Sequence, residues 1–403
     1  MKFQTLDDVN VKSKTVFVRV DLNCPIKNGK PQVSARVSAH AKTLFLLSKK
    51  GAKTVVLAHQ GRKGKDDFIS LAPHAKMLEK EINKISKPNK IKVEFIADVC
   101  GAPAQGAIKK LKDGQILLLE NTRFLDDEET FEKDKKSDLV KNLFPLCEVF
   151  VLDAFSVAHR SHASVCGFAK CAHVVAGPIM AEELSALCNL EKPKKPALLV
   201  IGGAKPSDSL PIMKQWLEQG KADSVLCGGA MANLMLFASG KSLGKPSEDF
   251  LQKNEALQNF EQTKKLYAKY KSKIIIPSDV IVDNLGKAKV VDSAFLPSDF
   301  AILDIGPETA RSYAKLISCA GSIVLNGPMG VYEKVQFSSG TKTVLGAVAK
   351  SGAFSLLGGG HTLSALEEFN IPYSKFGYVS LSGKALIEFL SGDELPGVKM
   401  LEH

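Results

Sequence analysis

Six arginines stand out among the 54 lysine and arginine side chains of this 403-residue chain. Arginine presents a planar guanidinium fork that binds a carboxylate or phosphate through two parallel hydrogen bonds, which lysine cannot do. Because the chain uses lysine for nearly every other cation, the few arginines mark positions where this geometry matters. Five of the six lie in the first 160 residues, and all six are Arg19, Arg36, Arg62, Arg123, Arg160 and Arg311. This distribution favours a compact site for a small anion in the first half of the chain.

Polar side chains directly follow four strand-like runs of this half. The four segments are 19–25 (RVDLNCP), 58–62 (AHQGR), 120–124 (ENTRF) and 153–162 (DAFSVAHRSH). Ligands of open α/β sheets bind at the carboxyl ends of the strands, so four such exits from one sheet predict a shared polyanion pocket. Taken singly, each segment would be an ordinary turn that carries a surface charge.

Glycine-rich segments take the corresponding places in the second half. Apolar runs are followed by 202–205 (GGAK), 228–230 (GGA), 326–333 (NGPMGVYE) and 358–362 (GGGHT). Glycine lets backbone N–H groups approach a phosphate, and the start of the following helix adds a favourable dipole. The four segments together predict a nucleotide-sized site, although each alone could be a tight strand-to-helix turn. The chain has no GxxxxGK[ST] and no GxGxxG, so a P-loop enzyme or a dinucleotide dehydrogenase lacks its main sign.

Short apolar runs alternate with longer amphipathic ones, as in parallel sheets covered by helices. The predicted strands are 15–22, 54–59, 92–97, 116–121 and 149–155, then 197–203, 224–228, 273–282, 300–305, 322–326 and 353–358. Helices are predicted near 36–50, 71–86, 103–112 and 130–144 in the first half. The fold class is therefore α/β, with two doubly wound parallel-sheet (Rossmann-like) domains joined by a hinge helix and a cleft between them.

A break at 191–196 (EKPKKP) follows a helical run and sets the domain boundaries. We expect a basic N-terminal domain at 1–177, an interdomain helix and linker at 178–195 and a C-terminal domain at 196–378. Residues 379–400 form a C-terminal segment expected to pack back near the hinge. Residues 401–403 are a candidate tag remnant.

The net charge of +11 is uneven, because residues 1–180 carry +10 and residues 181–403 carry +1. A basic half suits an anionic partner, either nucleic acid or a small phosphate or carboxylate compound. The chain lacks clusters of Lys and Arg interleaved with aromatic residues, which disfavours a nucleic-acid surface. A solvated basic face is the alternative.

Composition also bears on the compartment of the protein. No apolar stretch approaches the roughly 20 residues that span a bilayer, and residues 1–14 lack the apolar core of a signal peptide. The eight cysteines form no CxxC pair, which leaves zinc binding and thioredoxin-like chemistry without support. These features predict a cytoplasmic protein with reduced cysteines and no membrane partner.

The ordered motifs closely resemble the phosphoglycerate kinase family over essentially the whole chain. They are 19–23 (RVDLN), 118–124 (LLENTRF), 153–155 (DAF), 158–162 (AHRSH), 202–205 (GGAK), 326–331 (NGPMGV) and the tail 394–398 (ELPGV). Each motif alone is moderately specific, and the ordered set is highly specific. The resemblance implies reversible phosphoryl transfer in glycolysis and gluconeogenesis, with 1,3-bisphosphoglycerate and ADP giving 3-phosphoglycerate and ATP, with magnesium bound to the nucleotide.

The resemblance also assigns residues to the two ligands. It places 3-phosphoglycerate or 1,3-bisphosphoglycerate in the N-terminal domain, on Asp21, Asn23, Arg36, His59, Gln60, Gly61, Arg62, Arg123, Arg160 and His162. It places ATP or ADP in the C-terminal domain, on Gly203, Ala204, Lys205, Gly228, Gly229, Leu303, Asn326, Pro328, Gly330, Val331, Glu333, Gly358, Gly359, Gly360, His361 and Thr362.

Arg36 and Lys205 are the catalytic residues that the resemblance implies. The attacking carboxylate is already ionised and needs no general base, so catalysis consists of positioning and of cations that neutralise the transferring group. The acyl phosphate hydrolyses readily, which makes a hinge that excludes water an expected feature, and residues 180–190 are its predicted location.

Two positions and one turn depart from the usual family pattern and resemble its archaeal branch, and the late glycine-rich turn survives only as 380–384 (SLSGK). Ser209 replaces a lysine, and His361 replaces a carboxylate usually associated with the metal. An imidazole is a poor magnesium ligand, so we expect the phosphates and water to hold the ion, with Asp208 as a candidate ligand. Lys384 is a candidate for the missing cation.

Two other functions stay open at this point. The chain could be a catalytically silent nucleotide-binding regulator with the same fold, although Arg36, Lys205 and the full arginine set argue against loss of catalysis. It could also bind nucleic acid through the basic half. The resemblance favours a monomer that binds small molecules and no nucleic acid.

Overall fold

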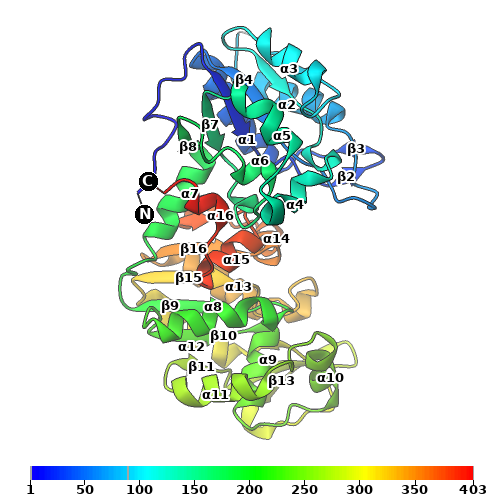
Figure 1. The fold of residues 1–403 in the computed structure, drawn as a ribbon. Coiled ribbons are helices and arrows are strands. Elements are labelled where there is room, and N and C mark those ends of the chain that lie inside the picture. Colours follow the sequence, from blue (N-terminus) through cyan, green and yellow to red (C-terminus); the bar gives the residue numbers. More distant parts are fainter. Residues whose placement is uncertain (1, 89, 403) are drawn as a thin grey trace. The chain divides into compact units, whose positions relative to one another are not determined.

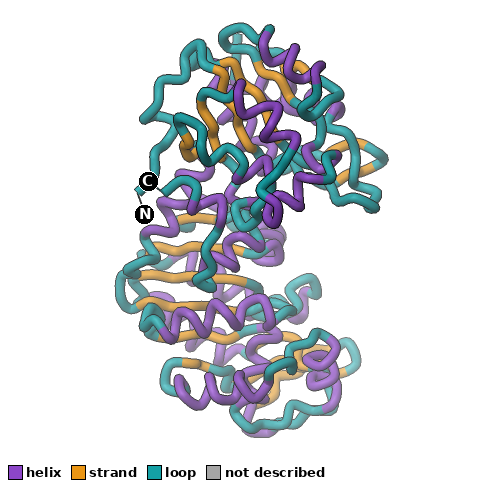
Figure 2. The backbone as a smooth tube through the Cα atoms, in the orientation of Figure 1, coloured by secondary structure: helices purple, strands orange, loops and turns teal. Residues whose placement is uncertain are grey.

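A computed structural model describes residues 2–88 and 90–402 of the chain. The chain divides into two compact units. Unit 1 comprises residues 1–185 and 394–403, and unit 2 comprises residues 186–393. Figures 1 and 2 show the course of the chain through each unit.

The sheet of unit 1 has six parallel strands in the order β5-β6-β4-β1-β7-β8. The strands are β1 (Thr15–Arg19), β4 (Lys53–Leu57), β5 (Val93–Phe95), β6 (Ile116–Leu118), β7 (Val149–Leu152) and β8 (Val174–Ala176). Strands β4, β6 and β7 are almost wholly buried apolar runs, as expected for strands covered on both faces. A small hairpin, β2 (Ile26–Lys27) and β3 (Lys30–Pro31), follows β1.

The helices of unit 1 form near the predicted amphipathic runs, except that one run is interrupted and the short helix at 163–166 was not predicted. They are α1 (Ala35–Lys49), α2 (Ala72–Ile85), α3 (Ala102–Lys109), α4 (Asp127–Asp134), α5 (Asp138–Leu143) and α6 (Ala163–Cys166). The run predicted as one helix at 130–144 is two, because Lys135 adopts a left-handed conformation with φ of 52°. The Ser137 hydroxyl then accepts a hydrogen bond from the Leu139 amide and starts α5.

The main sheet of unit 2 also has six parallel strands, in the order β11-β10-β9-β15-β16-β17. They are β9 (Ala197–Ile201), β10 (Ser224–Cys227), β11 (Ile274–Ile275), β15 (Ser322–Asn326), β16 (Phe354–Gly358) and β17 (Tyr378–Val379). The fold class of two parallel-sheet α/β units is thus confirmed.

Helices cover both faces of this sheet (Figure 2). Alternate residues of β9 and β15, such as Leu198 and Ile323, form one core with α12 (Pro307–Ser318), α13 (Ser339–Lys350) and α14 (Gly360–Glu368). The remaining helices of unit 2 are α8 (Pro206–Glu218), α9 (Gly229–Ala238), α10 (Lys245–Lys253), α11 (Phe260–Tyr270) and α15 (Lys384–Leu390).

A second sheet in unit 2 corrects the predicted strand series. The run 273–282, predicted as one strand, divides into β11 and β12 (Asp279–Asn284), because Pro277 lies between them and cannot donate to a ladder. Strand β12 pairs antiparallel with β13 (Lys287–Asp292) and with β14 (Ile302–Ile305), so the run 300–305 is also outside the parallel sheet. This three-stranded sheet carries part of a pocket described below.

Helix α7 (Pro178–Cys188) contains the boundary between the units, which falls after Ser185. At the other end of the chain, α16 (Pro396–Lys399) belongs to unit 1, where the Gly397 amide donates to the Ala158 carbonyl over 2.8 Å. Leu401 is fully buried and Glu402 bridges to Phe3, so these two residues are part of unit 1. His403, the last residue of the candidate tag, lies outside the described residues.

Candidate active-site residues

The polar segments predicted to follow the strands of unit 1 lie together at one edge of its sheet. The Asn23 side chain, after β1, accepts a hydrogen bond over 2.9 Å from the Gly61 amide, which follows β4. The Arg123 guanidinium, after β6, donates to the Gly61 carbonyl. Asn121 reinforces this join by donating over 2.8 Å to the Gln60 carbonyl. Three strand exits therefore share one network of hydrogen bonds, as their parallel arrangement requires.

The fourth segment, which follows β7, is connected to the others through Asp21, whose side chain is buried (3% exposed). Its carboxylate accepts hydrogen bonds from the Ser156 hydroxyl, which follows β7, and from Arg36 on α1 over 3.0 Å. Although burial raises the pKa of Asp21, the charge of Arg36 and the Ser156 hydroxyl outweigh it and lower that pKa. Asp21 is therefore an anion at neutral pH and orients Arg36.

The positive charges at this edge are close enough to act on one another. Burial, with the charges of Arg160 and Arg62, lowers the pKa of the Arg123 guanidinium. Burial likewise lowers the pKa of His162 to about 3, with help from Arg160 and Arg123. His59 is buried, and burial together with neighbouring guanidinium groups lowers its pKa well below the usual value. The histidines are neutral at physiological pH, and the arginines supply the positive charge.

Three supporting residues, Arg19, Ser164 and Glu128, were not among the predicted site residues. Arg19 is 1% exposed, and its guanidinium contacts the His59 Nδ1 atom over 2.9 Å. Its Nε donates over 2.9 Å to the Ser164 hydroxyl, which in turn donates to the buried carboxylate of Glu128. Burial lowers the pKa of Arg19 to about 10, so it remains charged. The sequence had marked Arg19 as one of the few arginines and as the end of a strand, but not as a support for His59.

In unit 2, the predicted glycine turns pack against each other between β9 and β15, where the strand order reverses. The Gly203 amide donates to the Pro328 carbonyl over 2.7 Å, and the Gly229 amide donates to the Met329 carbonyl over 2.7 Å. A Cβ atom on Gly202 would lie 2.0 Å from the Pro328 carbonyl oxygen. Only glycine permits this approach of two backbones, and such a switch point is where ligands of doubly wound sheets bind.

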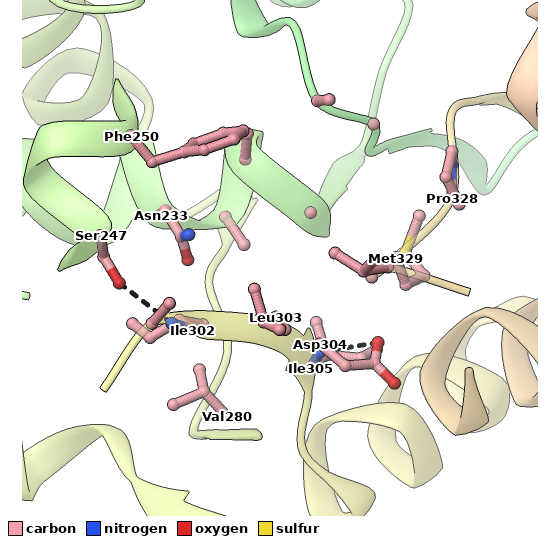
Figure 3. A pocket seen from close by; sticks show the side chains of 18 of the residues that line it. Asn233, Ser247, Phe250, Val280, Ile302, Leu303, Asp304, Ile305, Pro328 and Met329 are labelled. Atoms are coloured by element: carbon pink, nitrogen blue, oxygen red, sulfur yellow. Dashed lines mark hydrogen bonds between the residues drawn. The ribbon is translucent and has the colours of Figure 1, made fainter. Parts of the chain in front are cut away.

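An apolar pocket of about 280 Å³ opens beside these turns (Figure 3). Nine of the predicted nucleotide-binding residues line it: Gly203, Ala204, Gly229, Leu303, Pro328, Gly330, Val331, Glu333 and His361. Helices α9 and α10 and strand β14 form most of its remaining wall. The pocket thus brings together residues from seven separate segments of unit 2.

The other predicted nucleotide residues lie outside the lining of this pocket. They are Lys205, Gly228, Asn326, Gly358, Gly359, Gly360 and Thr362. Thr362 is nevertheless hydrogen-bonded to the same turns, since its hydroxyl accepts a hydrogen bond from the Gly327 amide over 2.9 Å. Lys205 directly follows Ala204, is exposed, and precedes the first turn of α8.

The three departures from the family pattern have definite surroundings. Ser209 is 2% exposed, and its hydroxyl accepts a hydrogen bond over 3.0 Å from the Asn326 side chain. His361 lies 3.7 Å from the Glu333 carboxylate, and Lys384 forms an ion pair of 3.0 Å with Glu388. Ser209 therefore supports Asn326, while Lys384 has a carboxylate partner of its own.

Sequence reasoning missed most of the apolar lining of the pocket. Missed residues include Asn233, Ser247, Phe250, Val280 and Ile302. Asp304 was also missed; burial raises the pKa of its carboxyl to about 7, against hydrogen bonds from the Gly340 and Ile305 amides. Most of these side chains sit within helices or strands, where their spacing is that of ordinary core residues.

No group of three or more His, Cys, Asp or Glu side chains with metal-binding geometry occurs within residues 2–88 and 90–402. Asp208, in the first turn of α8, is exposed and stands close in sequence to Lys205. This donor set fits an ion held mainly by a ligand's own oxygens. Across the same part of the chain, every helix is too short or too polar to cross a bilayer.

Comparison with known proteins identifies the family of the chain. A family model described as phosphoglycerate kinase matches residues 6–393. The phosphoglycerate kinase of Methanobacterium bryantii is 40% identical over 410 residues, which is 100% of this chain and 97% of that protein. That of Methanothermobacter thermautotrophicus is 40% identical over 408 residues, with the same two shares.

Solved structures give the same result for the fold. The phosphoglycerate kinase of Pyrococcus horikoshii OT3 is 36% identical, with a TM-score of 0.87 over 99% of this chain and 98% of that one. The phosphoglycerate kinase of Coxiella burnetii is 37% identical, with a TM-score of 0.84 over 99% of each chain. The match of family model, whole-length relatives and fold shows that this chain belongs to the phosphoglycerate kinase family.

Proposed function

We propose that the protein catalyses reversible phosphoryl transfer between ATP and the carboxylate of 3-phosphoglycerate, with 1,3-bisphosphoglycerate and ADP as the other pair. The observation that carries this proposal is the gathering of Arg62, Arg123 and Arg160 at one edge of the unit 1 sheet. A triose that carries both a phosphate and a carboxylate needs several guanidinium groups within a small space. The membership in the phosphoglycerate kinase family supports the same reaction.

In this proposal the triose phosphate binds Arg62, Arg123, Arg160 and the neutral imidazoles of His59 and His162. Neutral imidazoles offer hydrogen bonds without adding charge, so the guanidinium groups decide the electrostatic attraction. Asp21 holds Arg36 through the 3.0 Å ion pair, and the guanidinium group oriented in this way is the proposed partner of the reacting carboxylate. Asn23, Gln60 and Gly61 complete the triose site.

The nucleotide base occupies the apolar pocket of unit 2, and its phosphates meet the glycine turns. Lys205 stands next to the pocket residue Ala204 and is exposed, so its ammonium group is placed to neutralise the transferring phosphoryl group. Backbone amides at Gly358, Gly359 and Gly360, with Thr362, contribute donors at the start of α14. Glu333 is the acceptor proposed for the ribose hydroxyls.

Magnesium, when bound, would neutralise phosphate charge, and the sparse donor set indicates that the nucleotide itself supplies most of its ligands. Asp208 is the proposed protein contact. An Asp208→Asn variant with an unchanged magnesium dependence would remove that assignment.

Three finer features belong to the same proposal. Helix α7 would act as the hinge, since it contains the boundary between the two units, and motion about it would bring the two ligands together while excluding water. The family resemblance favours a monomer. The lack of a bilayer-spanning helix in the described chain fits a cytoplasmic enzyme of glycolysis.

A coupled assay that follows formation of 1,3-bisphosphoglycerate from ATP and 3-phosphoglycerate tests the function. Turnover distinguishes the enzyme from a silent regulator, which would bind ATP without producing the acyl phosphate. We expect Lys205→Ala to lower kcat by about 100-fold or more, because one cation that stabilises the transition state is lost.

Lys214→Ala is the matched control, since Lys214 is also an exposed lysine on or beside α8. Arg36→Lys should also lower kcat, because lysine keeps the charge and loses the fork. Equal turnover of Lys205→Ala and the unmodified protein would refute the role of Lys205.

A further inference from the structure

The apolar pocket of unit 2 contains one amide whose oxygen is unsatisfied. Asn233 lies on α9 and is 4% exposed. Its Oδ1 atom is buried and has no hydrogen-bond partner anywhere in the described part of the chain. In Figure 3 the amide points from α9 toward the strand that carries Ile302 and Leu303. A buried amide oxygen without a partner is costly, and such groups in native proteins usually await a ligand or water.

The polar groups near Asn233 are engaged elsewhere. The Ser247 hydroxyl accepts a hydrogen bond over 3.0 Å from the Ile302 amide and so fixes α10 against β14. The Asp304 carboxylate accepts from the Ile305 amide over 2.9 Å and from the Gly340 amide over 2.8 Å. Both groups therefore already accept hydrogen bonds within the protein, whereas the Asn233 Oδ1 atom accepts none.

The remaining walls are flat and apolar. The Phe250 ring on α10 is 40% exposed and borders the pocket, and Val280, Ile302 and Leu303 line it from the second sheet. Figure 3 shows Phe250 and the strand of Leu303 on opposite sides of the Asn233 amide. A slot with apolar walls and a single amide at depth suits a planar heterocycle that has hydrogen-bonding atoms on one edge.

The kind of edge follows from the chemistry of the amide. An asparagine side chain offers an acceptor and a donor side by side, and rotation about its last bond exchanges their places. Adenine presents an amino donor next to the N7 acceptor, which an asparagine pairs with bidentately. The same edge of guanine presents two acceptors, so it offers no donor to an unpaired amide oxygen.

We infer that Asn233 reads the edge of the nucleotide base and selects adenine. This inference rests on the proposed function, because it takes the pocket to be the base site of the phosphoryl donor. Phe250 and Leu303 accept any base on their apolar surfaces, and Asn233 supplies the discrimination. A site built to hydrogen-bond one group rejects an analogue that lacks it, because the buried polar atom is then left unpaired.

The experiment measures dissociation constants by calorimetry, without turnover, for ADP, GDP and purine riboside diphosphate, which lacks the amino group. The unmodified protein should bind ADP about tenfold more tightly than either of the other two. In Asn233→Leu, which has a similar volume and no amide, ADP affinity should fall about tenfold and the three constants should converge.

Phe250→Leu is the matched control, because it removes aromatic surface and should weaken all three nucleotides by a similar factor. Thermal melts of each variant identify a loss of folding, and the ligand series on the unmodified protein tests the inference without any substitution. A preference for ADP that survives in Asn233→Leu, or equal binding of the three nucleotides to the unmodified protein, would overturn the role of Asn233. Failure of the unmodified protein to bind any nucleotide or to turn over ATP would instead contradict the proposed function.

Discussion

At the scale of single residues, the environment of a side chain decides its chemistry more than its type does. His59 and His162 stand among arginines and are neutral, while Asp21 stays ionised because Arg36 faces it. Their presence at strand exits was predictable, since the carboxyl ends of parallel strands meet at one edge. Asn233 and Phe250 were not predictable, because residues in the middle of helices with core-like spacing carry no outward sign of a pocket.

Cys171 provides a residue-scale prediction. Its sulfur lies 3.6 Å from that of Cys147, ahead of the adjacent strands β8 and β7. The Cys147 thiol beside it lowers the pKa of Cys171 to about 6, against the effect of burial, whereas burial raises the pKa of Cys147. Because the thiolate is the nucleophile, Cys171 should react with iodoacetamide at a rate that is half-maximal near pH 6.

Mass spectrometry of peptides alkylated between pH 5 and pH 9 measures this profile, with the exposed Cys319 as the internal comparison. In Cys147→Ala the profile of Cys171 should move to higher pH, because the neighbouring donor is lost. Alkylation of Cys171 and Cys319 with the same midpoint would contradict the assignment.

At the scale of elements, hydrogen bonds between strands and helices set what a run of residues becomes. Most of the parallel strands were predicted within a few residues, because their continuous apolar runs are distinctive, but the short edge strands β8 and β17 were missed. The antiparallel sheet of β12, β13 and β14 was not, because β13 is mostly exposed and partner strands cannot be assigned from periodicity alone. The break at Lys135 was also missed, since its left-handed conformation carries no sequence sign there.

Helix α7 starts at a buried carboxylate, Asp153, that is also connected by hydrogen bonds to Asp21 in the proposed triose site. Asp153 is 0% exposed, and its Oδ1 atom accepts a hydrogen bond over 2.8 Å from the Ile179 amide in the first turn. Its Oδ2 atom contacts His40 Nδ1 over 3.2 Å, and His40 Nε2 accepts from the Asp21 amide over 3.1 Å. One carboxylate therefore fixes both the start of α7 and the tautomer of His40 that holds the Asp21 backbone.

Two substitutions of Asp153 should separate these functions. Asp153→Ala removes both and should lower the free energy of unfolding by about 2–4 kcal/mol, measured by urea titration. Asp153→Asn keeps an acceptor for the Ile179 amide but turns a donor toward His40, which reverses the His40 tautomer and leaves the Asp21 amide without its acceptor. This variant should lose less stability and show a raised KM for 3-phosphoglycerate.

Asp279→Asn is the matched control for this element. Asp279 is also a buried carboxylate that accepts from the first turn of a helix, through the Thr309 amide over 2.8 Å, but it lies in unit 2. The Asp279→Asn substitution should lower the free energy of unfolding without changing the KM for 3-phosphoglycerate. If the KM for 3-phosphoglycerate is unchanged in Asp153→Asn, the hydrogen bonds from Asp153 through His40 to the Asp21 amide do not affect binding at the proposed triose site.

At the scale of the whole molecule, the two units carry buried ionisable groups with opposite effects on stability. Unit 1 contains His59, His74 and His162, and burial lowers the pKa of each, to about 4 for His74 and about 3 for His162. Unit 2 contains Asp304, whose pKa burial raises to about 7. These buried groups titrate in the range between pH 4 and pH 7 and should therefore contribute to how each unit responds to pH.

The direction of each effect follows from proton linkage. A histidine with a folded-state pKa below its ordinary value of 6.5 binds fewer protons in the folded state, so its contribution is present above pH 6.5 and is lost as pH falls. Asp304 binds more protons in the folded state between its ordinary value of 3.8 and about pH 7, so its contribution is lost as pH rises. Each group changes the free energy of unfolding by up to roughly 1.4 kcal/mol per pH unit inside its window.

We therefore expect unit 1 to lose stability between pH 6.5 and pH 5 while unit 2 keeps or gains it. The single tryptophan, Trp216, is 2% exposed and lies in unit 2, so its fluorescence reports that unit alone, whereas far-ultraviolet circular dichroism reports both. Over this pH range the dichroism transition should broaden toward lower temperature while the fluorescence transition moves to higher temperature. His74→Gln should reduce the shift by removing one titrating group, and Asp304→Asn should flatten only the fluorescence response. The two transitions could instead coincide and move to lower temperature together as pH falls. That result would contradict the prediction, because a difference in proton linkage between the units must appear as a difference between the two probes.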